Sequence, residues 1–158
     1  SLIFTTTNGT LAVAAAEHMR LPSILLAGLV NRRAVCRHLQ QQSSPDDLLI
    51  VCAGTDGQVA LEDVLTAGAI VADLIAAQRF ACGNDSALLA LAAWQELDVA
   101  QEGGSTVLQH QLSLAVGGKN LLEAGYAADV KFAANLDSLD IVPAAVRSQH
   151  AESVFKRA

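Results

Sequence analysis

The chain alternates between short apolar runs and longer segments with helical periodicity. The run 48–53 (LLIVCA) shows no polar alternation, so both faces of this predicted strand are expected to be buried, as in the centre of a mainly parallel sheet. A turn with two glycines follows at 54–57, and apolar residues then recur at helical spacing from Leu61. Ligands of parallel sheets bind where strands end and helices begin. We therefore expect any active site to include part of the segment 54–63.

Three other apolar segments are predicted to be strands of the same sheet, beginning at Leu2, Ser23 and Ile141. Helices are predicted over 11–19, 32–41, 61–77, 85–97 and 105–123, and the last of these is expected to be interrupted at the glycines 117–118. In the helix predicted over 32–41, the side chains of Arg32, Arg33 and Arg37 are expected on the exposed face. The alternation of strands and helices predicts a layered α/β/α fold with a mainly parallel or mixed sheet. We assign 1–147 to a single α/β domain and 148–158 to a polar C-terminal tail that frays.

Composition narrows the classes of function. The 158 residues are 52% hydrophobic, yet no run approaches the roughly 20 apolar residues that span a bilayer. The net charge of −6 argues against nucleic acid, because binding to phosphate backbones requires a basic surface. Aromatic residues make up only 4%, which leaves little for stacking on bases. We therefore expect neither a nucleic-acid nor a membrane partner.

The three cysteines, at 36, 52 and 82, lack the spacing of a disulfide framework or a zinc site. This favours a reducing, cytoplasmic location. None of them has an arginine six positions later, which excludes the thiol phosphatase loop, and the P-loop and GxGxxG signatures are also absent. The chain lacks an initial Met and enters a predicted strand at once, so we expect it to be the remainder of a longer chain.

Hydroxyl, amide and carboxylate side chains gather at the predicted strand ends. Such groups hold Mg²⁺, and loop amides at helix N-termini hold phosphate. The members are Thr6, Thr7, Asn8, Thr10, Thr55, Asp56, Glu62, Asp63, Asn84, Asp85 and Asp137. Each also has an ordinary explanation, because such residues cap helices, form Asp-Gly turns or suit the positive end of a helix dipole. Chemistry alone leaves both interpretations open.

Several short motifs resemble those of the 2-phosphosulfolactate phosphatase family. The similar runs, in order along residues 2–146, are 6–10 (TTNGT), 52–57 (CAGTDG), 61–63 (LED), 67–68 (AG), 84–87 (NDSA), 118–119 (GK), Gly125, 129–130 (DV), 136–137 (LD) and 142–143 (VP). The resemblance implies a Mg²⁺-dependent phosphatase that releases phosphate from a small, anionic, sulfonated phosphoester. The product would be 3-sulfolactate, on the route to coenzyme M.

On this basis the candidate residues receive three roles. The predicted metal ligands are Glu62, Asp63 and Asp137. The residues predicted to bind phosphate or the other acid group of the substrate are Asn8, Gly9, Thr10, Gly54, Thr55 and Lys119. The predicted catalytic residues are Asp63 and Asp85. The chain departs from the family at Lys119, where arginine and its bidentate fork are usual, at Ala133, where cysteine is usual, and in lacking the family's N-terminal segment.

The alternative function is a truncated, non-catalytic binding or assembly module that keeps the scaffold without a complete site.

A separate prediction concerns association. The leucines and Trp94 of the apolar helix 85–97 cannot all face one core. This predicts a homo-oligomer, most simply a two-fold dimer, with this helix at or beside the interface. The opposing interpretation is that the helix is covered on both sides within one subunit.

Overall fold

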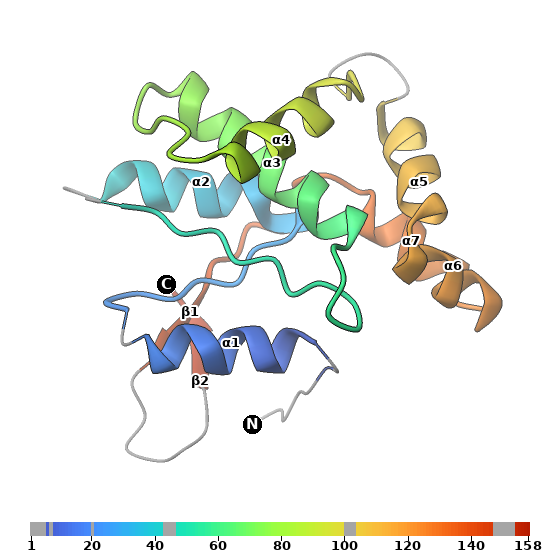
Figure 1. Ribbon diagram of the computed structural model, residues 1–158, viewed down its shortest axis with the longest axis horizontal. Helices are drawn as coiled ribbons and strands as arrows, with labels where there is room; N and C mark the ends of the chain where they lie inside the picture. Colours follow the sequence, from blue (N-terminus) through green and yellow to red (C-terminus); the bar gives the residue numbers. More distant parts are fainter. Residues whose placement is uncertain (1–5, 7, 20, 43–46, 100–103, 147–153) are drawn as a thin grey trace.

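The computed structural model describes residues 6, 8–19, 21–42, 47–99, 104–146 and 154–158, and this part of the chain is mostly helical (Figure 1). Its elements are α1 (Gly9–His18), the 3₁₀ helix η1 (Leu29–Asn31), α2 (Arg32–Gln41), α3 (Leu61–Ala76), α4 (Asp85–Gln95), α5 (Gly104–Leu114), α6 (Val116–Glu123), α7 (Ala127–Ala133), β1 (Pro143–Val146) and β2 (Val154–Arg157). Among the described helices, none is both long enough and apolar enough to span a membrane.

The sheet differs from the predicted one. Within the described ranges it consists of β1 and β2, which pair antiparallel. The segment at Ser23 contributes a single bridge, between Leu25 and Ala144, and the segment at Ile141 becomes a strand only from Pro143. The strand predicted at Leu2 lies outside the described residues. Helices and a small sheet are thus both present, but a layered parallel sheet is not shown.

The predicted polar tail contains a strand. Residues 154–157 form β2, which pairs with β1 so that Lys156 lies opposite Ala144. The side chain of Arg157 donates a hydrogen bond of 3.2 Å to the backbone oxygen of Asp140. Strand pairing therefore ties residues 154–157 to the domain, where fraying was expected.

Segment 48–53 is extended but is not part of the described sheet. Leu48 and Ile50 pack against buried side chains of α2 and α3, whereas Leu49 and Val51 are 55% and 49% exposed. The prediction that both faces of this segment are buried is therefore wrong. Within the described residues, α2 and α3 pack on the face that carries Leu48 and Ile50, and the face that carries Leu49 and Val51 is half exposed. An uninterrupted apolar run does not reveal whether a second layer is present.

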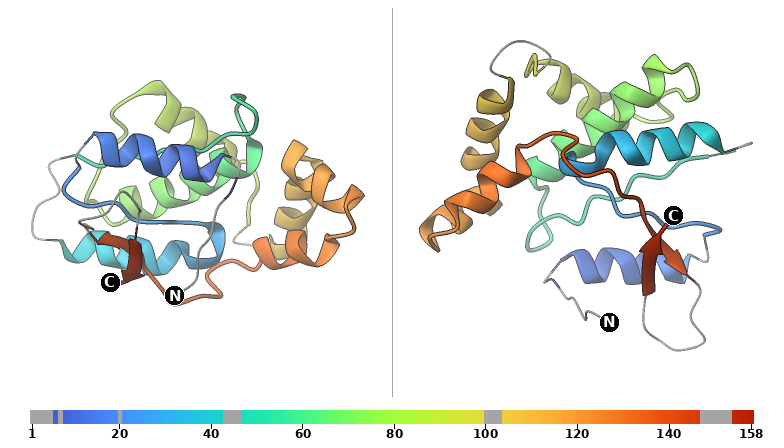
Figure 2. Two further views of the ribbon diagram at one scale, coloured as in Figure 1. Left: turned by 90° about the horizontal axis from the view of Figure 1, so that it is seen from below. Right: turned by 180° about the vertical axis from the view of Figure 1, so that it is seen from behind.

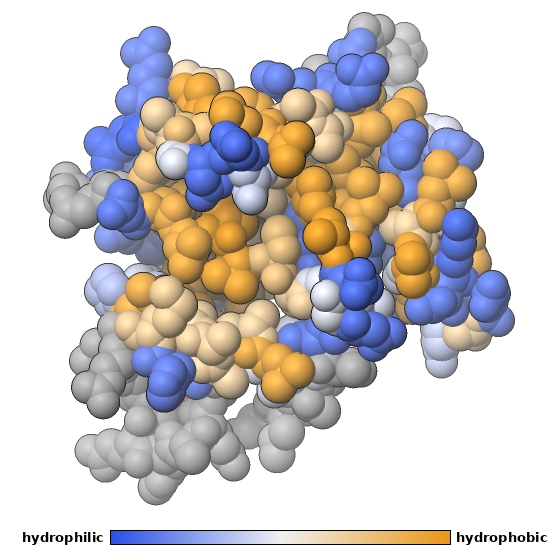
Figure 3. All heavy atoms as spheres, viewed as in Figure 1, coloured by the Kyte–Doolittle hydropathy of each residue, from blue (hydrophilic) through white to orange (hydrophobic). Residues whose placement is uncertain are grey.

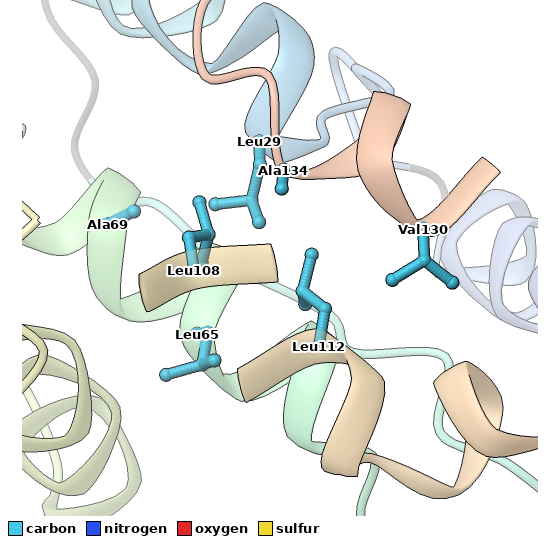
Figure 4. Packing of buried hydrophobic residues seen from close by; sticks show 7 residues of the cluster. All are labelled: Leu29, Leu65, Ala69, Leu108, Leu112, Val130 and Ala134. Atoms are coloured by element: carbon cyan, nitrogen blue, oxygen red, sulfur yellow. The ribbon is translucent and has the colours of Figure 1, made fainter. Parts of the chain in front are cut away.

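The main hydrophobic core lies where α3, α5 and α7 meet (Figure 4). It is formed by Leu29, Leu65, Ala69, Leu108, Leu112, Val130 and Ala134. Leu65 and Ala69 are one turn apart on α3, as are Leu108 and Leu112 on α5, so each helix presents a stripe of i, i+4 residues to this core. The packing brings the start of α3 close to the junction between α5 and α6.

Gly68→Ala is expected to lower the free energy of unfolding by about 2 kcal/mol or more, as overpacked cores do. A Cβ at position 68 would overlap the backbone carbonyl of Ala90 and lie 2.8 Å from the Cβ of Trp94, so α4 would have to move. The matched control is Gly83→Ala, where an added Cβ meets nothing within 4 Å. Urea denaturation measures both variants, and equal effects would contradict close packing of α3 on α4.

One face of α4 is packed and the other is exposed. Trp94 and Leu97 pack against the main core, whereas Leu88 and Leu89 are 52% and 70% exposed. Figure 3 shows apolar side chains spread over the central face of the molecule, above α3, α4 and the extended segment beside them. The dimer expected through this helix stays a prediction.

Candidate functional site

The turn at 54–57 is held against the first turn of α3. The backbone N–H of Gly54 donates to Oδ2 of Asp63 at 2.7 Å. Thr55 and Gln58 exchange backbone hydrogen bonds of 3.0 and 2.9 Å. Gly54 and Gly57 have φ angles of +70° and +73°, the left-handed region that glycine adopts without strain. The structure thus brings together three of the predicted site residues, Gly54, Thr55 and Asp63.

Glu62 points away from Asp63 and toward α6. Successive residues of a helix are about 100° apart around its axis, and Oε1 of Glu62 lies where a Cβ of Gly117 would be. Oε2 of Glu62 is buried, and it has no hydrogen-bond partner among the described residues. Because a buried polar oxygen without a partner is costly, this oxygen marks a candidate position for a ligand.

A cavity of about 360 Å³ opens between the 54–57 turn and the α5–α6 junction. Its lining includes Thr55, the start of α3 at Ala60 and Leu61, and the start of α6 at Ala115 and Val116. Neither Ala60 nor Ala115 supplies a side-chain cap. The first N–H groups of both helices therefore donate no hydrogen bond to a capping side chain. Uncapped N–H groups at a helix start can bind anions.

Lys119 lies on α6, one turn beyond the part of this helix that lines the cavity. It follows Val116 by three residues, so the two side chains share a face of α6. Lys119 is exposed, and its flexible stem carries a compact positive charge. Its predicted role in binding an anion is compatible with this position.

Three predicted phosphate-binding residues lie at the start of α1: Asn8 precedes the helix, and Gly9 and Thr10 are its first two residues. Figures 1 and 2 show the start of α1 near the turn at 55–58 in each view. Asn8 precedes α1 without a capping hydrogen bond from its side chain, and Thr10 Oγ1 accepts a hydrogen bond of 3.0 Å from the N–H of Thr6. A Cβ at Gly9 would lie 2.7 Å from Thr6 Oγ1. Asn8, Gly9 and Thr10 are thus neighbours of the turn but are positioned independently of it.

Asp137 lies away from the first turn of α3. Its carboxylate accepts hydrogen bonds from Arg32 Nε at 3.2 Å, from Arg32 Nη2 at 2.5 Å and from the backbone N–H of Arg33 at 2.7 Å. Arg32 also binds Asp73 at 2.8 Å, roughly 15 Å along α3 from Asp63. The structure therefore does not bring the predicted metal trio to one place, because two arginines hold the carboxylate of Asp137.

The charge state of Asp137 follows from these contacts. Burial by itself raises the pKa of the carboxyl, but the hydrogen bonds from Arg32 and Arg33 and the charges of their guanidinium groups outweigh it and hold the pKa below its usual value. Asp137 is therefore an ionised partner of arginine. In the part of the chain that the structure describes, no three His, Cys, Asp or Glu side chains are grouped so that they could hold a metal ion. Mg²⁺ stays a prediction.

Asp85 lies at the far end of the α3–α4 pair from Asp63. Segment 77–84 joins the end of α3 to the start of α4, and Gly68 and Ala90 meet at mid-helix, so the two helices run antiparallel. Asp85 is exposed in the first turn of α4, which Asn84 caps. The predicted catalytic pair, Asp63 and Asp85, is therefore not brought together.

Two buried polar residues were not predicted from the sequence. Arg32 is buried, although its side chain was predicted to lie on the exposed face of the helix. It precedes Leu39 by two helical turns, and this period places it on the packed face of α2. Asn31 is also buried, and its amide bridges the backbone of 26–28 to that of Ile141. Helical periodicity could have indicated Arg32, but no local signal indicates Asn31.

The described structure contains all three cysteines as free thiols. Burial raises the pKa of Cys36 to about 12, and burial together with the charge of Asp63 raises that of Cys52. Because the thiolate is the nucleophile, raised pKa values make these thiols weak nucleophiles. This agrees with the absence of a thiol phosphatase loop.

One cavity is thus lined by a threonine and by the starts of two helices that lack side-chain caps, and uncapped helix starts are typical sites for binding a small anion. A family model described as 2-phosphosulpholactate phosphatase matches residues 1–148. The chain belongs to this family.

Individual relatives agree with this assignment. A protein of Deinococcus radiodurans named "Probable 2-phosphosulfolactate phosphatase" is 38% identical over 146 residues, which cover 92% of this chain and 56% of the relative. Proteins of the same name from Caldanaerobacter subterraneus and Thermotoga maritima are 36% and 34% identical, and the matches cover 54% and 57% of their lengths. The chain thus spans just over half the length of these relatives.

Proposed function

We propose that the protein hydrolyses a small sulfonated phosphomonoester, such as 2-phosphosulfolactate, at the site between the first turns of α3 and α6. The proposal depends mainly on Glu62, whose buried Oε2 has no partner in the described structure. Membership of the family supports the reaction and the substrate class. In this proposal the product is 3-sulfolactate, on the route to coenzyme M.

The residues around the cavity have distinct roles in this proposal. The free N–H groups at the starts of α3 and α6 and the Thr55 hydroxyl bind the phosphate oxygens. Lys119 lies one turn beyond Val116 and complements the second acid group of the substrate. Asp63 positions the 54–57 turn through its hydrogen bond with Gly54. These contacts hold a doubly anionic molecule with donors that are already in place.

Mg²⁺ fits this site in part. Mg²⁺ is usually bound by one or two carboxylates together with waters and substrate phosphate, and the unpartnered oxygen of Glu62 is suited to such a role. We assign Glu62 as the residue that would hold the ion. Asp63 is left out because it faces another side of α3 and binds the Gly54 N–H, and Asp137 because arginines engage it. When bound, the ion would neutralise phosphate charge and polarise a phosphoryl oxygen.

The direct test is release of phosphate from 2-phosphosulfolactate by the purified chain. We expect release that requires Mg²⁺, stops with EDTA and is slower with phospholactate, which lacks the sulfonate. Metal-independent release, or equal rates for the two substrates, would contradict the proposed metal or substrate class respectively. A chain that releases no phosphate from either substrate would contradict catalysis.

Gly117→Ala is expected to lower kcat by about tenfold or more while leaving stability unchanged or slightly raised. A methyl group at position 117 would overlap Oε1 of Glu62, and small displacements of catalytic groups are costly. The Glu62 side chain can move aside, and alanine favours helix over glycine by about 1 kcal/mol. Steady-state kinetics measure the expected fall in kcat, and thermal unfolding measures the stability. Unchanged kcat would show that the position of Glu62 does not matter.

A non-catalytic binding module is the second candidate. It is favoured by the positions of Asp85 and Asp137, which lie away from the cavity. Calorimetry with Mg²⁺, phosphate and sulfolactate distinguishes the possibilities. Binding without phosphate release favours this module, whereas neither binding nor release indicates a structural scaffold.

A further inference from the structure

Asp56 lines the cavity between the 54–57 turn and the α5–α6 junction, and it is the one ionisable residue among the described residues of that lining. The rest of the lining consists of Thr55, Gln58 and the apolar residues of 59–61 and 114–116. None of these other side chains exchanges a proton near neutral pH. If a reaction in this cavity requires transfer of a proton to the substrate, Asp56 is the side chain placed to make it.

The turn holds the backbone of Asp56 in a fixed position. The φ angles of Asp56 and Gly57 are +50° and +73°, and positive φ at both central residues is typical of a type I′ turn. Thr55 and Gln58 close the turn by exchanging backbone hydrogen bonds, and the carboxylate of Asp63 anchors it to the first turn of α3. A carboxyl group carried on this turn keeps its place relative to the helix starts, as catalytic groups require.

Hydrolysis of an alkyl phosphomonoester requires a proton at the leaving oxygen, because an alkoxide is a strongly basic leaving group. In the proposed function, N–H groups at the starts of α3 and α6 hold the phosphate, and these groups donate hydrogen bonds without giving up their protons. The turn that carries Asp56 lies across the cavity from the start of α6. The ester oxygen of a bound substrate can therefore face the Asp56 carboxyl.

A bound phosphate favours the protonated form of Asp56. The dianion brings negative charge next to the carboxyl group and displaces water from it, and both effects disfavour a carboxylate. The apolar neighbours Val59, Leu61 and Val116 supply no positive charge that would keep the group ionised. Asp56 therefore suits the role of an acid in the occupied cavity.

We propose that Asp56 is the general acid that protonates the leaving group, an inference that rests on the proposed phosphatase function. The oxygen of water forms a bond to phosphorus while the bond from phosphorus to the ester oxygen breaks, and the electron pair of that bond stays on the ester oxygen. The carboxyl proton of Asp56 moves to the same oxygen, so the alcohol leaves as a neutral molecule. The attacking water loses one proton, and Asp56 regains one from solvent, so one ester and one water give one alcohol and one phosphate.

The test compares two esters that differ in their need for an acid. The alkoxide of 2-phosphosulfolactate must be protonated as it leaves, whereas p-nitrophenolate leaves without a proton. Asp56→Asn is expected to lower kcat for 2-phosphosulfolactate about 100-fold, and the fall for p-nitrophenyl phosphate is expected to be smaller by about tenfold or more. KM is expected to stay the same or fall, because the variant removes a negative charge. Asparagine also adopts the left-handed backbone readily, so the turn is retained.

The matched control is Asp129→Asn, the same substitution at an exposed residue in the first turn of α7. It is expected to leave kcat for both esters within about twofold. If Asp56→Asn lowers kcat equally for both esters, Asp56 only shapes the turn. A fall of less than about tenfold for 2-phosphosulfolactate would mean that no acid acts there. Either result overturns the role of Asp56 and leaves the phosphatase standing.

Two further outcomes concern the wild-type chain. If it does not accept p-nitrophenyl phosphate, the comparison of kcat with KM for 2-phosphosulfolactate decides: a fall in kcat of about 100-fold at constant KM supports the acid, and a rise in KM alone overturns it. A wild-type chain that releases no phosphate from either ester overturns the phosphatase, and the role of Asp56 with it.

Discussion

Replacing Arg32 with methionine is expected to lower the free energy of unfolding by about 3–5 kcal/mol, the cost of removing one partner from a buried ion pair. The Arg32 side chain is 10% exposed and joins Asp137, 9% exposed, to Asp73, 33% exposed. Without the guanidinium, Asp137 keeps the N–H of Arg33 but loses two hydrogen bonds where little water can replace them. Urea denaturation monitored by circular dichroism measures the loss.

Arg33→Met is the matched control, because it is the same substitution at the next residue. The Arg33 guanidinium is 66% exposed and lies 3.5 Å from Asp137, so we expect a loss below about 1 kcal/mol. Combining Arg32→Met with Asp137→Asn is expected to recover part of the stability, since the double variant has no uncompensated charge at position 137. Similar losses for Arg32→Met and Arg33→Met would mean that burial of the pair is unimportant.

Glu62→Gln is expected to lower kcat for phosphate release by about 100-fold or more, the range seen for groups that handle protons or metals in catalysis. Glutamine has the same size and shape as glutamate, so the contact over Gly117 is kept while the charge is lost. We expect no loss of stability, because a buried carboxylate oxygen without a partner is itself unfavourable. A fall in kcat at equal or higher stability would separate a functional role from a structural one.

The control for this variant is Glu123→Gln, the same substitution at the exposed last residue of α6. It is expected to leave kcat within about twofold, because screening by water and salt removes most of the effect of a distant exposed charge. Magnesium titrations of both variants add a second measurement. If Glu62→Gln kept more than half of the activity and the same magnesium dependence, Glu62 would not belong to the site.

Local signals in the sequence were sufficient for most helix boundaries. The predicted starts of α3 at Leu61 and of α4 at Asp85 are confirmed. Asn84 caps α4, because its side-chain oxygen accepts a hydrogen bond from the N–H of Ala87. Gly125 has a φ of +86° just after α6, as a residue that ends a helix should. The break predicted at 117–118 is instead at Ala115. These glycines lie within α6 because Gly118 approaches the backbone of Leu112 too closely for a side chain.

The candidate site could be predicted only where its members are neighbours in sequence. Gly54, Thr55 and Asp63 come together because one turn connects them. The approach of Glu62 to Gly117 depends on packing of α3 against α5 and could not be read from either segment alone. Assignment to the family came from ordered motifs, which do not require knowledge of these contacts.

The sequence by itself determined the helices, the 54–57 turn and the family, because caps, glycine conformations and helical periods act over a few residues. The tertiary structure decided which apolar faces are covered and which carboxylates are engaged. Segment 48–53 has an apolar composition that fits a central strand, yet in the described structure α2 and α3 pack on one of its faces while Leu49 and Val51 stay half exposed. Asp137 has the chemistry of a metal ligand, yet Arg32, 105 positions away, takes its carboxylate. Burial and charge pairing depend on which distant segments meet, and a local pattern does not contain that information.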